Sequence, residues 1–92
     1  MKQSRRCPKC QSARIGHLDR LPDTLGPETR VVWRHLALER EGGVLRATGR
    51  IEAYVCTECG YLETYVVEAH RLPFDRLEGF SWVGEAVGGP YR

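Results

Sequence analysis

The ten residues Glu52-Ala53-Tyr54-Val55-Cys56-Thr57-Glu58-Cys59-Gly60-Tyr61 decide the fold of this 92-residue chain. They end a segment, residues 45–55, in which apolar residues alternate with Arg46, Thr48, Arg50, Glu52 and Tyr54. That period of two predicts a half-buried strand. Residues 61–69 are rich in Tyr, Val and Thr, and we expect them to return antiparallel. The Cys-x-x-Cys pair therefore lies at the tip of a predicted β-hairpin, where Gly60 can adopt a positive φ.

Another pair, Cys7-Pro8-Lys9-Cys10, occurs near the N-terminus, and 45 residues separate it from Cys56. Two cysteines in a tight Cys-x-x-Cys turn direct both sulfurs at one point, and Pro8 favours that turn. Two such turns facing each other make a tetrahedral S₄ site, so we predict one zinc ion held by Cys7, Cys10, Cys56 and Cys59. Four thiolates leave no open position for water, and the zinc is therefore expected to be structural.

The same four cysteines could serve a redox motif, disulfides or an iron site. A thioredoxin-like redox motif needs a strand before the first pair and a helix after it, and residues 11–14 begin no amphipathic helix. Disulfides rarely persist in a reducing compartment. Iron in the same cage, as in rubredoxins, stays open as the minor alternative, because soft tetrahedral thiolate sites suit both metals.

The rest of the chain predicts a single domain over residues 1–92, with a basic leader at 1–6 and an insertion at 21–43. We expect a short strand at 13–18 and a loop at 21–27, where two prolines and a glycine interrupt regular structure. Residues 29–40 have helix-like flanks at Pro27 and Glu28, but Val31, Val32 and Trp33 favour a strand, followed by a turn at 41–43. Residues 72–83 are expected to form a coil or short helix that caps one sheet face, and 84–92 a flexible tail. The predicted fold class is small all-β, a zinc ribbon with an inserted strand or hairpin arm.

The charge and hydropathy of the chain say more about where in the cell the protein is expected than about what it binds. The net charge is +2, but the first twenty residues carry +5 and the remainder −3. The N-terminal residues have no apolar core typical of a signal peptide, and no apolar run approaches the ~20 residues that span a bilayer. We therefore expect a cytoplasmic protein without membrane association.

The chain resembles uncharacterised bacterial zinc-ribbon proteins, some described as nucleic-acid-binding. The resemblance rests on Arg6-Cys7-Pro8-Lys9-Cys10 and on residues 52–61, less than half of the chain. It implies a zinc-ribbon fold with a structural metal, and nucleic-acid binding by analogy. Two departures are Gln11, where a ribbon commonly has glycine, and the 45-residue separation, which exceeds the roughly 15–20 residues of a compact ribbon.

The functional expectation is a protein-interaction module within a larger assembly, through a protein partner or self-association. Phe74, Phe80 and Trp82 either cover the ribbon's own sheet or form a contact surface. The alternative is a nucleic-acid-binding ribbon, because cations attract phosphates and aromatic rings stack on bases. Its candidate residues are Lys9, Arg14, Arg46, Arg50 and Tyr54. A rubredoxin-like electron carrier follows only if the metal is iron. No nucleophile and base stand at a meaningful spacing, so we expect neither catalysis nor a small-molecule substrate.

Overall fold

Antiparallel strands form nearly all of the regular structure in the computed structural model, which describes residues 1–25 and 30–84. The strands are β1 (Ile15–Leu18), β2 (Pro22–Leu25), β3 (Val31–Trp33), β4 (His35–Glu41), β5 (Val44–Cys56) and β6 (Leu62–Val66). Two 3₁₀ turns follow, η2 (Ala69–Arg71) and η3 (Phe74–Arg76). The prediction of a small all-β fold is confirmed.

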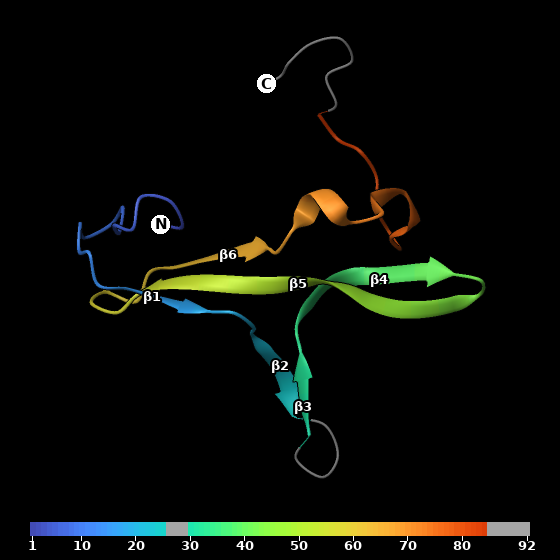
Figure 1. Ribbon diagram of the computed structural model, residues 1–92, viewed down its shortest axis with the longest axis horizontal. Helices are drawn as coiled ribbons and strands as arrows, with labels where there is room; N and C mark the ends of the chain where they lie inside the picture. The colour runs from blue at the N-terminus through green and yellow to red at the C-terminus, as the bar shows by residue number, and fades with distance from the viewer. Residues whose placement is uncertain (26–29, 85–92) are drawn as a thin grey trace.

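The long strand β5 is the axis of the molecule (Figure 1). Its first half pairs with β4, and its second half pairs with β1 on one edge and β6 on the other. The strands predicted at 13–18, 45–55 and 61–69 are present as β1, β5 and β6, but β1 begins only at Ile15 and β6 ends at Val66, before η2. Because β5 ends at Cys56, it delivers the second cysteine pair to the tip of the β5–β6 hairpin.

The β4–β5 hairpin turns at the predicted glycine pair. Gly42 and Gly43 have φ values of 59° and 82°, and Glu41 pairs directly with Val44. Positive φ at both central residues defines a two-residue turn that matches the twist of the flanking strands.

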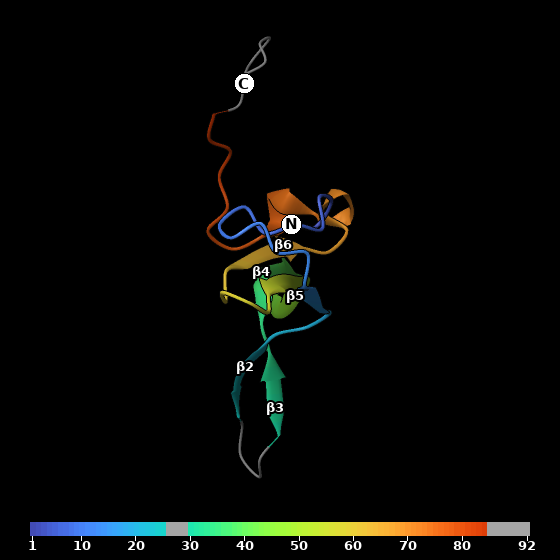
Figure 2. The same ribbon diagram turned by 90° about the vertical axis from the view of Figure 1, so that its left-hand side faces the viewer.

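The insertion is divided between two structures. Strands β2 and β3 pair only with each other and form an arm that points away from the main sheet, opposite the C-terminal segment (Figures 1 and 2). Strand β4 joins the main sheet. The loop predicted at 21–27 is wrong for Pro22–Leu25, because Pro22 takes the first position of an edge strand, where its missing N–H costs no ladder bond. The strand predicted over 29–40 is broken at Arg34. Pro27 and Glu28, the predicted helix-start residues, lie outside the described residues.

One face of the main sheet is covered by the basic leader. The strand alternation predicts Glu52 to be solvent-facing, but its exposure is only 8%. The reason is that Lys2 and His17 lie over it: Lys2 Nζ donates to Glu52 Oε2, and His17 Nε2 is 2.9 Å from Glu52 Oε1. The leader, residues 1–6, is thus part of the folded structure.

The C-terminal segment joins β4 along its free edge, whereas the prediction for residues 72–83 is a cap over one sheet face. Leu77 forms an isolated antiparallel bridge with Glu39 and is buried, and the Glu78 N–H donates to the Leu38 carbonyl at 2.8 Å. Phe74 packs on Phe80 beside it. The flexible tail predicted at 84–92 lies, apart from Gly84, outside the described residues.

Replacing Glu52 with glutamine is expected to destabilise the folded chain by about 1–2 kcal/mol at neutral pH, since a charge-assisted hydrogen bond is lost. The bond from Lys2 lowers the pKa of Glu52. Its stabilisation is therefore complete above the ordinary carboxyl pKa and declines as the pH falls through the lowered value. Denaturant unfolding of the metal-loaded protein measures the loss.

Glu58→Gln is the matched control for Glu52→Gln, because Glu58 is an exposed acid in the same hairpin, 3.5 Å from Arg14. Exposed pairs contribute little, so this variant is expected to lose less than about 0.5 kcal/mol. Equal losses in the two variants would show that burial by the leader does not strengthen the Glu52 interaction.

Candidate metal centre

The two cysteine pairs form turns with the same backbone hydrogen bonds. In the first, the Gln11 N–H donates to the Cys7 carbonyl at 2.9 Å, and the Cys7 N–H donates to the Ser12 carbonyl at 2.9 Å. In the second, Gly60 and Tyr61 take the equivalent positions around Cys56, each at 2.8 Å. Such turns aim backbone N–H groups at the first sulfur of each pair. The Cys10 N–H donates to Cys7 Sγ and the Cys59 N–H donates to Cys56 Sγ, each with a nitrogen–sulfur distance of 3.4 Å.

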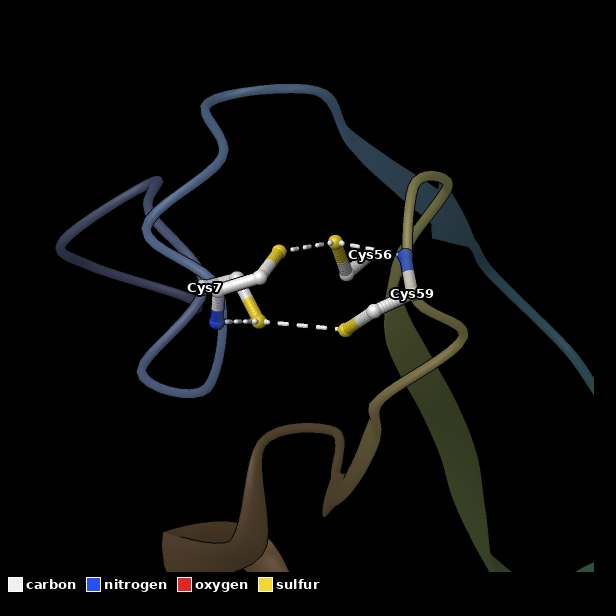
Figure 3. Close-up of side chains that lie close together, drawn as sticks. Cys7, Cys56 and Cys59 are labelled. Atoms are coloured by element: carbon white, nitrogen blue, oxygen red, sulfur yellow. Dashed lines mark hydrogen bonds between the residues drawn. The ribbon is translucent and has the colours of Figure 1, made fainter.

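The four sulfurs converge at one point between the turns. Their Sγ atoms all lie within 4.8 Å of one another. Across the turns, Cys7 Sγ is 3.7 Å from Cys59 Sγ, and Cys10 Sγ is 3.5 Å from Cys56 Sγ (Figure 3). Four thiolates around zinc at ~2.3 Å have sulfur–sulfur edges of about 3.8 Å, whereas a disulfide needs ~2.05 Å. The donor set therefore fits a tetrahedral metal ion.

The electrostatics of the sulfurs also favour a cation. The Cys59 N–H stabilises the Cys56 thiolate and, despite burial, lowers the pKa of Cys56 to about 6. The backbone bond from Ser12 favours the Cys10 thiolate, but the bond with Cys56 and burial outweigh it and raise the pKa of Cys10 to about 12. Without a cation, the Cys56 thiolate forms readily and its negative charge disfavours ionisation of the facing Cys10 thiol. A divalent ion allows all four to be thiolates.

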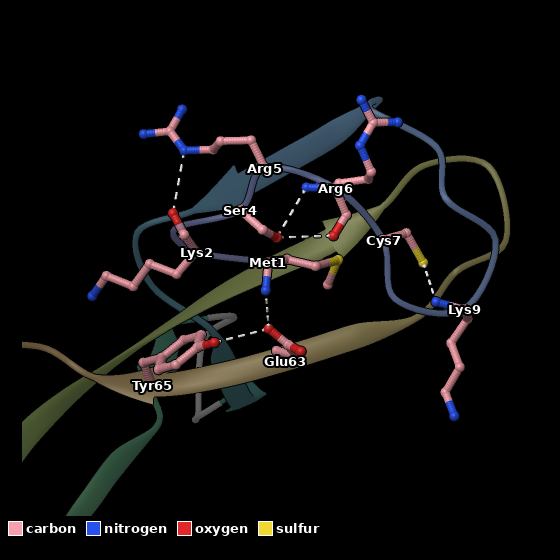
Figure 4. Close-up of polar contacts among 9 residues, drawn as sticks. All are labelled: Met1, Lys2, Ser4, Arg5, Arg6, Cys7, Lys9, Glu63 and Tyr65. Atoms are coloured by element: carbon pink, nitrogen blue, oxygen red, sulfur yellow. Dashed lines mark hydrogen bonds and ion pairs between the residues drawn. The ribbon is translucent and has the colours of Figure 1, made fainter.

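The site is anchored by Met1 of the leader, which contacts β6. Cys7 and Cys56 are fully buried and pack with Met1 into one cluster, whereas Cys10 and Cys59 are exposed. The Met1 α-amino group donates to Glu63 Oε1 at 2.6 Å, and Glu63 also accepts from the Tyr65 hydroxyl at 2.8 Å (Figure 4).

A further clamp joins the two turns through Thr57. Its N–H and its hydroxyl both donate to the Arg14 carbonyl, at 3.0 and 2.8 Å. This clamp fixes the second turn against the segment that leads from the first turn into β1.

Gln11 adopts the glycine conformation that its sequence position requires. Its φ is 67°, against 85° for Gly60 in the equivalent position. A left-handed conformation costs a non-glycine residue about 1–2 kcal/mol, partly offset by the greater chain entropy that glycine loses on folding. We therefore expect Gln11→Gly to stabilise the metal-loaded protein by roughly 0.5–1 kcal/mol, measured as a higher thermal midpoint.

Gly60→Gln is the reciprocal control, because an added Cβ at Gly60 meets no atom within 4 Å, so only its φ is penalised. It is expected to lower the thermal midpoint. A Gln11→Gly variant less stable than the natural protein would mean that the Gln11 side chain, and not the turn conformation, determines stability there.

The candidate nucleic-acid residues do not form one patch. Lys9 and Arg14 flank the metal site: Lys9 Nζ lies 5.5 Å from the Tyr61 ring centroid, and Arg14 pairs with Glu58. Arg46 lies in the β4–β5 half and is within 4 Å of two glutamates, Glu39 and Glu41.

Arg50 and Tyr54 are also engaged by neighbours. Arg50 Nη1 donates to the Asp19 carbonyl at 3.1 Å, and Tyr54 packs between His17 and Tyr65, with ring centroids 4.7 and 5.9 Å away. His17 bonds Glu52 and is not one of the residues grouped around the sulfurs.

Sequence reasoning missed three residues that support the site without being ligands, namely Met1, Thr57 and Glu63. Only Thr57 carried a local signal, as a hydroxyl next to a cysteine in a tight turn. The contacts of Met1 and Glu63 join positions 62 residues apart, and no pattern along the chain encodes them.

The fold and the site together define a small all-β protein with a zinc-ribbon-like four-cysteine metal-binding site. Comparisons with protein-family models, with curated proteins and with solved structures found no match. Within residues 1–25 and 30–84, no helix has the length and apolar character to cross a membrane.

Proposed function

We propose that this chain is a structural-zinc protein whose metal centre rigidifies a β scaffold that binds other protein chains, without catalysis. The observation that carries this proposal is the amount of apolar side chain left exposed on the strands. Large apolar residues that are 38–62% exposed occur on β1, β3, β4, β5 and β6. They are Leu18, Val31, Val32, Trp33, Leu36, Leu38, Val44, Leu45 and Leu62. Extended exposed apolar surface is typical of protein–protein contact sites.

The zinc would be held by Cys7, Cys10, Cys56 and Cys59, where it would lock the leader and β1 to the β5–β6 hairpin. Structural zinc binding in finger peptides is worth about 10–16 kcal/mol, comparable to the net stability of a domain. The buried hydrophobic residues among those described are few: Met1, Cys7, Ile51, Ala53, Cys56 and Leu77. A core this small supports the view that the metal supplies much of the folding free energy.

Metal content and the visible spectrum of protein purified without added metal test the zinc assignment. One zinc per chain and no colour is the expected result. One iron per chain, with thiolate-to-iron absorption that bleaches on reduction, would replace the proposal with a rubredoxin-like electron carrier.

Affinity capture tests the interaction function. The zinc-loaded chain is expected to retain a specific protein from lysate of its source cells, and the purified pair is expected to re-form in isothermal titration. A Leu62→Glu, Val32→Glu double variant should lose that partner. Failure of the natural chain to bind any protein, itself included, would reject the proposal.

Nucleic-acid binding is a second candidate, favoured by three exposed cations at the first turn. Arg5, Arg6 and Lys9 take part in none of the salt bridges found among the described residues. Fluorescence anisotropy with single- and double-stranded RNA and DNA at low salt tests it. Salt-dependent binding that falls on replacing these three residues with alanine would favour this candidate, and no binding at micromolar protein would reject it.

A further inference from the structure

In the part of the main sheet formed by β1, the second half of β5 and β6, the described residues of one face include no ionisable side chain. Residues opposite each other in antiparallel strands share a face, so the pairings place Gly16, Leu18, Ile51, Ala53, Val55, Leu62, Thr64 and Val66 together. We call this set the open face. The other face holds Glu52, Glu63, His17 and the leader. The two faces therefore differ sharply in charge.

The open face is hollowed beside the arm. A groove of about 480 Å³ is bounded by Ile51 and Leu62 of the open face, by Leu21 and Pro22 at the base of the arm, and by Leu36 of β4. Its lining is predominantly apolar, with Arg34 and His35 at the arm side. A groove of this kind accepts apolar side chains from another surface.

The arm beside the groove has apolar residues without cover. Val31 and Val32 are exposed, and Trp33 is contacted by Arg20, whose guanidinium lies 5.6 Å from the ring centroid. Alternation along β3 places Val31 and Trp33 on one side of the arm and Val32 on the other. An isolated two-stranded hairpin is marginally stable in water, so the arm needs further packing to be well ordered.

We propose that the surface formed by the open face and the arm binds a second copy of this chain and makes a two-fold symmetric dimer. The inference rests on the proposed function, since it names the partner for that interaction surface. In a two-fold interface each copy presents the same patch, so the groove of one chain can receive the arm of the other, and the reverse.

The apolar area available matches what a homodimer buries. The exposed fractions are 49% for Leu18 and Leu62, 42% for Leu36, 44% for Val31, 45% for Val32 and 38% for Trp33. At these exposed fractions the six residues present several hundred Å² of surface, most of it apolar, which is of the order of the ~800 Å² that each subunit buries in a standard interface.

The charges favour a second copy over a partner of opposite charge. The open face offers no charge for an acidic or basic partner to recognise, and depletion of charge is characteristic of homodimer interface cores. In the groove, Arg34 lies 3.2 Å from Asp23 of the same chain. Two copies can therefore bring their Arg34 side chains together without leaving them as uncompensated like charges.

Sedimentation equilibrium of the full-length, zinc-loaded chain over a range of concentrations tests the dimer. The natural chain, of 10.5 kDa, is expected to show twice that mass at micromolar concentration. Leu62→Glu and, separately, Val32→Glu are each expected to weaken association at least about 30-fold, because each places a carboxylate at the centre of an apolar interface. Val83→Glu is the matched control, because Val83 is an exposed valine of the C-terminal segment and belongs to neither the open face nor the arm; it should leave the dimer intact.

Zinc content of one per chain and an unchanged circular dichroism spectrum establish that each variant is folded. A natural chain that stays monomeric at all concentrations, a dimer insensitive to both glutamates, or an open-ended series of larger oligomers would each overturn the proposal. A monomer that still captures another protein through Leu62 and Val32 rejects the second copy and leaves the proposed function standing. A dimer that captures no other protein supports the inference and makes self-association the whole of that function.

Discussion

Replacing Cys56 with serine is expected to weaken zinc binding by about 10²–10³-fold and to unfold the metal-site end of the protein. Four ligands share a binding free energy of about 10–16 kcal/mol, so one thiolate accounts for roughly 3–4 kcal/mol. Cys56, like Cys7, is fully buried and packs with Met1 in one cluster, whereas Cys10 and Cys59 are exposed. Zinc per chain by mass spectrometry, with thermal unfolding by circular dichroism, measures both effects.

Thr57→Val is the matched control for Cys56→Ser, since it changes the adjacent residue and removes only the hydroxyl bond to the Arg14 carbonyl. This variant should keep one zinc and lose about 1 kcal/mol of stability. Removing zinc from the natural chain with a chelator should reproduce the Cys56→Ser spectrum. A Cys56→Ser protein that binds one zinc and melts like the natural chain would contradict a structural role for the metal.

The parts of the fold that the sequence predicts are those specified by neighbouring residues. A strand period in residues 45–55, a glycine pair at 42–43 and two Cys-x-x-Cys turns each need only a few adjacent positions to be recognised. Because the turns are local and the four sulfurs must meet for a metal, the donor set also followed from spacing. The same reasoning anticipated that the position after Cys10 is unusual, and Gln11 there adopts a positive φ.

The features that escaped prediction depend on contacts between distant segments. Strand β2 exists because it pairs with β3, a preference stronger than the turn signals of Pro22 and its neighbours. Glu52 is buried because the leader folds over it, although the alternation along β5 predicts that its side chain faces solvent. The five candidate nucleic-acid residues were linked by type alone, and most of their neighbours in space are acids or rings that no local pattern places there.

A second large effect is expected from Gly49→Ala, which should destabilise the protein by about 2–5 kcal/mol. Gly49 lies inside β5 with a φ of 86°, and a Cβ added there would be 2.7 Å from the Leu36 Cβ. The left-handed conformation costs about 1–2 kcal/mol, and forced overlap in a packed site about 1–3 kcal/mol more. The clashing atom is attached directly to the β4 backbone, so no change of side-chain rotamer relieves it. Denaturant unfolding of the zinc-loaded variant measures the loss.

Gly43→Ala separates the two contributions in Gly49→Ala, because Gly43 has a similar φ of 82° but nothing within 4 Å of an added Cβ. It should lose only the conformational part, about 1–2 kcal/mol. Leu36→Gly combined with Gly49→Ala removes the clashing atom and should cost less than the sum of the two single substitutions. Equal losses in the Gly43 and Gly49 variants would mean that β4 shifts to accommodate the methyl group. Zinc content should stay at one per chain in both, since the metal-binding turns lie at the far end of β5 from the β4–β5 turn.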